Sequence, residues 1–126
     1  MKKHVVLACA VIAFLPGAAG AQQQDAVAAL ADDLKAHAPA TWEIRVRWRD
    51  GQLLASITPW PYQQAFDLWY DISKLSDTLR GLCPDRSGKV WALIASNQDI
   101  VLEPTVGGKS VVEARVNCRA TRSNQL

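Results

Sequence analysis

Residues 42–57 carry the pattern that sets the strongest limit on the fold of this chain. Apolar residues alternate with charged ones along the first half of the segment, as Trp42, Ile44, Val46 and Trp48 against Glu43, Arg45, Arg47 and Arg49. A period of two is typical of a strand with one buried face. Asp50-Gly51 follows at once, and Asp-Gly favours a two-residue type I′ turn because both of its central residues take positive φ. The segment is therefore predicted to be a β-hairpin.

The two-residue turn also fixes the register of this hairpin. It sets each apolar residue of the first strand against an apolar partner, as Trp48–Leu53, Val46–Ala55 and Ile44–Ile57. One face is then buried. The opposite face consists of Arg45, Arg47, Arg49, Gln52, Leu54 and Ser56, and we call it the arginine face. We expect it to point away from the core and to expose Leu54, because helices can cover only one side of such a sheet.

Residues 1–21 have the composition of a secretory signal peptide. Lys2 and Lys3 precede an apolar stretch at residues 4–15, and Ala19-Gly20-Ala21 is an A-x-A cleavage site. The apolar stretch is shorter than the roughly 20 residues that span a bilayer. We expect cleavage after Ala21, export to the periplasm or outside a bacterial cell, and no membrane insertion afterwards.

Cleavage changes the size and the charge of the chain. Removing 21 of the 126 residues leaves 105, which is enough for a single domain, predicted over residues 22–118. The Lys and Arg count falls from 14 to 12 and then equals the 12 Asp and Glu residues. Nucleic-acid binding and membrane-surface binding both need a surplus of basic side chains. We therefore expect neither nucleic acid nor a membrane surface as a partner.

Two cysteines, Cys83 and Cys118, remain after cleavage. An even pair in an exported protein is most simply one disulfide. No C-x-x-C motif is present, and no basic residue or histidine lies beside Cys83. We therefore predict a structural disulfide in preference to a redox or nucleophilic thiol.

The pattern of apolar residues in the rest of the chain predicts two helices, three strands and a tail. Helical spacing of apolar residues indicates helices at 25–38 and 62–82. A meander of strands is predicted at 90–96, 99–106 and 110–118, followed by a polar, disordered tail at 119–126. A three-residue turn at 107–109 sets Leu102 opposite Ala114, and it also sets Glu103 opposite Glu113, a mildly unfavourable pair of like charges.

The predicted order is α-β-β-α-β-β-β. It corresponds to a two-layer α+β domain in which two helices pack on one face of a five-stranded, mainly antiparallel sheet. Cys83 follows the second helix and Cys118 ends the last strand, so the disulfide is expected to tie helix to sheet.

Residues that could carry chemistry are few. His37 is the one histidine left after cleavage, and we expect it to pair with Asp33 and favour the helix dipole. Asp67 and Asp71 are expected on a solvated helix face. One histidine and a disulfide cannot supply the usual zinc ligands. We predict no catalytic group, no metal and no cofactor.

Two surfaces could bind a partner, namely the arginine face and an aromatic corner in which the rigid residues Pro59 and Pro61 hold Trp60 and Tyr62 near the surface. Arg, Trp and Tyr are enriched in protein interfaces, and aromatic rings also stack on sugars. We expect a non-enzymatic protein of the inhibitor, immunity or secretion-accessory type, which binds another envelope or secreted protein. The alternative is a small-ligand or glycan module that uses Trp60 and Tyr62. An enzyme is the third hypothesis, and no oligomeric state is indicated.

Overall fold

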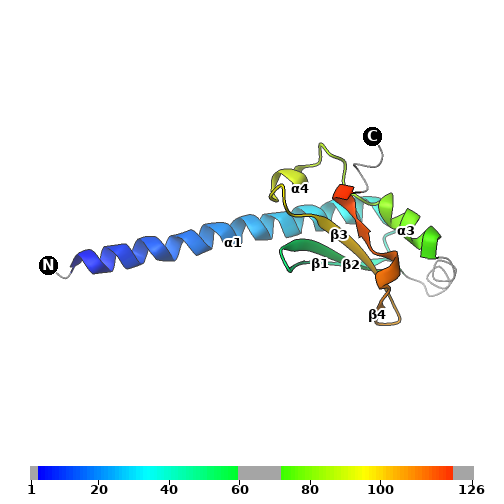
Figure 1. Ribbon diagram of the computed structural model, residues 1–126, viewed down its shortest axis with the longest axis horizontal. Helices are drawn as coiled ribbons and strands as arrows, with labels where there is room; N and C mark the ends of the chain where they lie inside the picture. The colour runs from blue at the N-terminus through cyan, green and yellow to red at the C-terminus, as the bar shows by residue number, and fades with distance from the viewer. Residues whose placement is uncertain (1–2, 60–71, 121–126) are drawn as a thin grey trace.

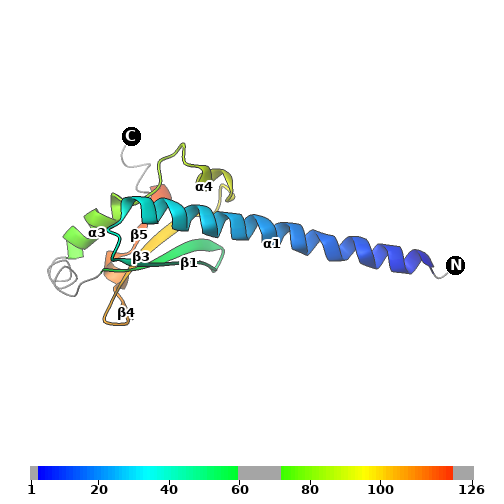
Figure 2. The same cartoon turned by 180° about the vertical axis from the view of Figure 1, so that it is seen from behind.

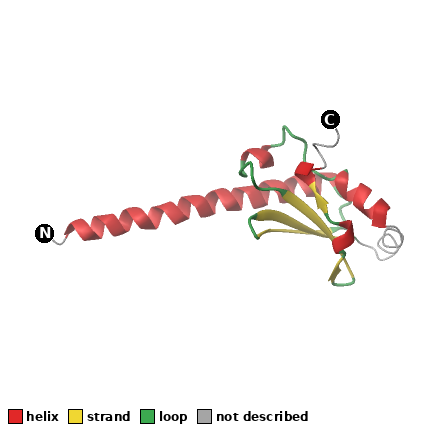
Figure 3. Ribbon diagram, in the orientation of Figure 1, coloured by secondary structure: helices red, strands yellow, loops and turns green. Residues whose placement is uncertain are grey.

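The computed structural model describes residues 3–59 and 72–120, with side chains from residue 20 onward (Figure 1). Helices lie on one side of a five-stranded mixed sheet, which confirms the α+β class. The elements follow the predicted order up to α3 and depart from it afterwards (Figure 3): α1 (Lys3–His37), β1 (Glu43–Arg49), β2 (Gln52–Thr58), α3 (Ile72–Arg80), α4 (Lys89–Ala92), β3 (Ile100–Val106), β4 (Lys109–Ser110), a 3-10 turn η1 (Val112–Ala114) and β5 (Val116–Asn117).

The β1–β2 hairpin is confirmed in its register. Arg49 pairs with Gln52, and the other pairs follow as predicted, out to Ile44 with Ile57. Asp50 has φ 52° and Gly51 has φ 77°, as a type I′ turn requires. Asp50 is the only described non-glycine residue with positive φ, so the turn sequence determines the geometry here.

The sheet has the order β1-β2-β3-β4, and β5 also pairs with β3. Three of the four pairings are antiparallel, but β2 and β3 are parallel, with Leu54 opposite Val101 and Ser56 opposite Glu103. Parallel neighbours need a crossover connection, and the segment between β2 and β3 contains α3 and α4. The hairpin and the C-terminal strands thus form one continuous sheet.

The prediction of a strand at residues 90–96 is wrong. Residues Lys89–Ala92 form the short helix α4, and a loop leads from it to β3. Val90 is buried, and Trp91, Leu93 and Ile94 are partly buried against the main core. A short apolar run is compatible with a buried strand or a helical turn, and here the run covers α1 instead of joining the sheet.

The predicted last strand, residues 110–118, is interrupted. Gly107 and Gly108 form a two-residue turn with φ 60° and 79°, in place of the expected three-residue turn. The turn η1 then separates β4 from β5, so that Leu102 pairs with Val116 instead of Ala114. This shift of two residues removes the unfavourable Glu103–Glu113 pair.

Helix α1 lies across one face of the sheet (Figure 2), and the core lies between this face and the helices. Its fully buried members come from α1, β2, β3 and the end of α3, and include Leu30, Leu34, Leu53, Ile57, Leu79, Ile100 and Leu102. A smaller cluster joins Leu75 of α3 to Val111 and Ala114 beside η1. The predicted apolar stripes of both helices face the core at most of their described positions, including Leu30, Leu34, Leu75 and Leu79, but Ile72 at the start of α3 is 42% exposed.

Helix α1 is longer than the predicted helix at 25–38. Its N-terminal half extends well beyond the sheet in both views (Figures 1 and 2). The first described contacts with the domain are made by Gln22, whose Nε2 donates to the Leu93 carbonyl at 3.3 Å, and by Gln23, whose carbonyl accepts from Trp48 Nε1 at 3.0 Å. None of the described helices combines the length and apolar character needed to cross a membrane.

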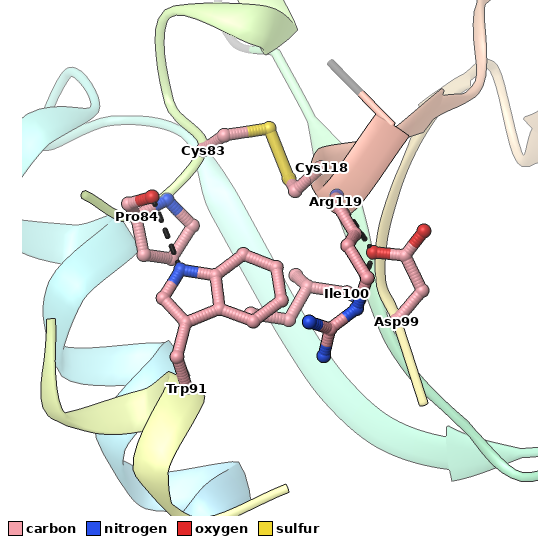
Figure 4. Close-up of a disulfide and its surroundings, with 7 residues drawn as sticks. All are labelled: Cys83, Pro84, Trp91, Asp99, Ile100, Cys118 and Arg119. Atoms are coloured by element: carbon pink, nitrogen blue, oxygen red, sulfur yellow. Dashed lines mark hydrogen bonds between the residues drawn. A yellow bond between two sulfur atoms is a disulfide. The ribbon is translucent and has the colours of Figure 1, made fainter. Parts of the chain in front are cut away.

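The predicted disulfide joins Cys83 to Cys118 (Figure 4). Beside it, the Arg119 guanidinium lies 4.8 Å from the centre of the Trp91 ring, and the Trp91 indole donates to the Pro84 carbonyl at 3.3 Å. The Arg119 amide donates to Asp99 Oδ1 at 2.8 Å. Arg119 was predicted to begin a disordered tail, but the disulfide at the preceding residue holds it against the domain.

Candidate functional site

The arginine face is the outer side of the sheet, away from α1 and α3. Pairing between strands continues it onto β3, because Leu54 lies beside Val101 and Ser56 beside Glu103. Successive residues of a strand point to opposite faces, so the same side carries Arg45, Arg47 and Arg49 of β1. The structure therefore brings the predicted arginines together with two residues of β3 that sequence reasoning left out of the site.

The three arginines of β1 are exposed, and they differ in their partners. Arg45 Nε donates to Glu43 Oε1 at 2.7 Å. Arg49 Nε lies 3.9 Å from Asp50 Oδ2, a loose contact on a turn side chain that is 93% exposed. Within residues 3–59 and 72–120, no carboxylate lies within ion-pair distance of Arg47. Two of the three guanidiniums are thus weakly paired or unpaired within the described part of the chain.

Leu54 is not exposed, which corrects the prediction for this residue. It is 4% accessible. The reason is its position on an interior strand, where Arg47 flanks it on one side and Val101 on the other. Long basic side chains cover apolar neighbours with their aliphatic stems. Leu54 and Val101 therefore form an apolar floor beneath the charged groups.

Glu103 and Arg115 form an ion pair on the same face. Glu103 is 2% exposed, and Arg115 Nε donates to its Oε2 at 2.8 Å. Burial raises the pKa of the Glu103 carboxyl, but hydrogen bonds from Ser110 and Arg115 and the charges of Arg115 and Arg49 outweigh this and hold its pKa below the usual value. In the sequence, the only indication that Glu103 has a different partner was the unfavourable Glu103–Glu113 pair in the predicted register.

An open hollow of about 160 Å³ lies over the apolar floor, and it is lined by Arg49, Asp50, Gln52, Leu54, Val101 and Arg115. Arg49 and Arg115 contribute guanidiniums to this lining, and of the two Arg49 is the one with only the loose contact to Asp50, because Arg115 pairs with Glu103. Guanidiniums bind carboxylates in bidentate fashion, and a small apolar floor beside them can receive a methyl or methylene group. The hollow is suited to an acidic side chain with an apolar neighbour.

Trp60 and Tyr62, the aromatic corner, lie outside the described residues, as do Asp67 and Asp71. The glycan or small-ligand alternative therefore remains a prediction. His37 lies where it was expected, with Nδ1 2.7 Å from the Asp33 carbonyl oxygen and 3.8 Å from Asp33 Oδ2. In the described part of the chain, no three His, Cys, Asp or Glu side chains are grouped to hold a metal.

A scan against protein-family models, a search of curated proteins and a search of solved structures each found no match to this chain. Its function is therefore inferred from geometry and charge.

Proposed function

We propose that the chain is an exported, non-enzymatic bacterial protein that binds an acidic surface of another envelope or secreted protein through the arginine face. The observation that carries this proposal is that Arg47 has no ion-pair partner within residues 3–59 and 72–120 and that Arg49 is only loosely paired, beside the buried floor of Leu54 and Val101. Exposed arginines around a small apolar floor have the composition of the centre of a protein interface.

Export is supported by the way in which tertiary contacts begin. The expected cleavage site after Ala21 immediately precedes Gln22 and Gln23, which make the first described contacts with the domain. Ala26, a few residues later, is fully buried. Cleavage there would leave these contacts intact. The Cys83–Cys118 disulfide is typical of an oxidising compartment.

A protein partner is favoured over a polyanion by the charge distribution. Acidic and basic side chains balance beyond residue 21, so Arg45, Arg47 and Arg49 form a local group of basic residues on a chain with no net side-chain charge in this part. A local patch selects a partner of complementary local charge and accelerates its association. Inhibitors, immunity proteins and secretion accessories are the classes of protein that such a patch would suit.

Charge reversal tests the proposed surface. The double variant Arg45→Glu, Arg47→Glu is compared with a matched control, Lys89→Glu, Lys109→Glu, which makes the same charge change at two exposed residues away from the arginine face. Each tagged protein is expressed in its native host and its co-purifying proteins are quantified by mass spectrometry. We expect the first variant to fold normally by circular dichroism and to lose a partner that the control retains. If both variants captured the partner equally well, the arginine face would not be the binding surface.

Export is tested separately by sequencing the N-terminus of the protein recovered from the periplasm or the medium. We expect it to begin at Gln22. A chain that retains residues 1–21 in the cytoplasm would contradict the export part of the proposal.

A further inference from the structure

Strand β1 is the edge of the sheet among the described strands, since it pairs with β2 alone. The Leu53 amide donates to the Asp99 carbonyl on the β3 side at 3.0 Å, so the backbone of Leu53 faces away from β1. Its partner Trp48 therefore sits in a non-hydrogen-bonded pair, and such pairs alternate along an antiparallel ladder. The backbone groups of Ile44, Val46 and Trp48 consequently point to the open edge.

The side chains of β1 are arranged in the same alternation. Ile44, Val46 and Trp48 are only partly buried against the core, whereas their partners Leu53, Ala55 and Ile57 are fully buried. The intervening residues Arg45, Arg47 and Arg49 are exposed on the outer face. Among the described residues, this edge strand of seven residues thus offers backbone groups without a strand partner, a half-covered apolar row and a cationic row.

We propose that the partner adds an extended segment to β1, with acidic residues at alternate positions and apolar residues between them. The acidic residues would lie beside Arg45, Arg47 and Arg49, while the apolar ones would cover Ile44 and Val46. Main-chain hydrogen bonds supply affinity in this mode and alternate side chains supply specificity. The proposal rests on the proposed function, because it specifies how the same arginines are used.

Charge complementarity favours such a segment over a second copy of this chain. A second β1 laid antiparallel and centred on Arg47 would set Arg47 against Arg47 and Arg45 against Arg49. Like charges directly opposite are unfavourable, whereas opposite charges stabilise a cross-strand pair. Charged side chains on an edge discourage like edges from pairing, and they leave it selective for a strand of the opposite charge.

The probe is an alternating peptide of four glutamates and three valines with capped ends. One control has the same composition with the glutamates in a block, and another has N-methyl groups on the valines. Amide hydrogen exchange of the processed, isotopically labelled protein is followed by NMR. At about 90% occupancy, the alternating peptide is expected to slow exchange about tenfold at the amides of Ile44, Val46 and Trp48, with little change at Arg45 and Arg47. Equal protection by the block peptide, or no protection at these three amides, overturns strand addition.

Two variants separate this inference from the proposed function. Val46→Pro removes an N–H that points to the open edge and makes no bond within the sheet, which is the position where edge strands tolerate proline. Arg47→Glu reverses the charge at the centre of the arginine row. Both are expected to abolish protection. If Arg47→Glu abolishes capture of the native partner while a folded Val46→Pro variant retains it, strand addition is wrong and the arginine face stands. If neither change matters, both proposals fall. Should Val46→Pro not fold, the N-methylated peptide decides the same question.

Discussion

Arg115 holds the carboxylate of Glu103 on the outer face of the sheet, with its Nε 2.8 Å from Glu103 Oε2. Glu103 is almost completely buried, whereas the Arg115 side chain is 40% exposed. Through Arg115, the pair therefore lines one side of the hollow over Leu54 and Val101. It also fixes the path of the chain after η1, because Arg115 directly precedes β5.

Replacing Glu103 with Gln is expected to lower the free energy of unfolding. The change removes a buried charge that accepts bonds from Arg115 and Ser110, and a partly buried pair of this kind contributes about 1–3 kcal/mol. Urea denaturation measures the effect. Glu113→Gln is the matched control, since Glu113 is exposed, and its effect should stay within about 0.5 kcal/mol. Equal losses in the two variants would show that the ion pair contributes nothing specific.

Acid should destabilise the protein partly through Glu103. Its pKa is lowered in the folded state, so the unfolded chain binds the proton more readily. The contribution is therefore complete above the unfolded pKa of about 4.3 and is lost as pH falls through the folded pKa. The free energy of unfolding, measured between pH 7 and pH 2, should fall less steeply below about pH 4 in Glu103→Gln. Parallel curves for the two proteins would contradict this assignment.

The disulfide should stabilise the fold mainly by restricting the unfolded chain. Cys83 and Cys118 are 35 residues apart, and closing a loop of this length is worth about 4 kcal/mol in the chain-entropy model. The double variant Cys83→Ser, Cys118→Ser should lose about this amount in urea denaturation. Arg119, held beside Trp91 and Asp99, should then lose amide protection before the β1–β2 hairpin does. Loss of protection in the hairpin first would argue against local anchoring.

Trp48 should fasten the part of α1 that begins at Gln22 to the sheet. Its indole donates to the Gln23 carbonyl at 3.0 Å, which lies two residues beyond the expected cleavage site. Trp48→Phe keeps most of the apolar surface but removes this bond, at an expected cost of about 1 kcal/mol. The amides of residues 26–30 should exchange faster in the variant, as measured by NMR. Unchanged exchange there would show that the bond does not hold the N-terminus of the domain.

Local chemistry explains which parts of the fold could be predicted from sequence. The β1–β2 hairpin was predicted in full because its turn residues, its alternation and its pairing all require one register. The disulfide followed from the cysteine count and the expected compartment. The prediction of a strand at residues 90–96 was wrong because short apolar runs fit a strand or a helical turn equally well. Only packing against α1 decides between the two.

The candidate site was predicted in part for a similar reason. Alternation places Arg45, Arg47 and Arg49 on one face without knowledge of the neighbouring strands. The burial of Leu54 depends on Val101 of β3, and this parallel pairing has no local signal in the sequence. Arg115 reaches Glu103 because η1 shifts the pairing of β5 with β3 by two residues from the predicted register. No turn motif in the sequence indicates this shift.

Photo-crosslinking in living cells of the native host tests the binding surface. A photoreactive residue replaces Gln52, on the arginine face, or Asp32, which is exposed on α1. We expect a discrete crosslinked protein from position 52 that disappears when Arg45→Glu and Arg47→Glu are added, and none from position 32. A crosslink from position 32 alone, or one from position 52 that survives charge reversal, would contradict recognition through the arginine face.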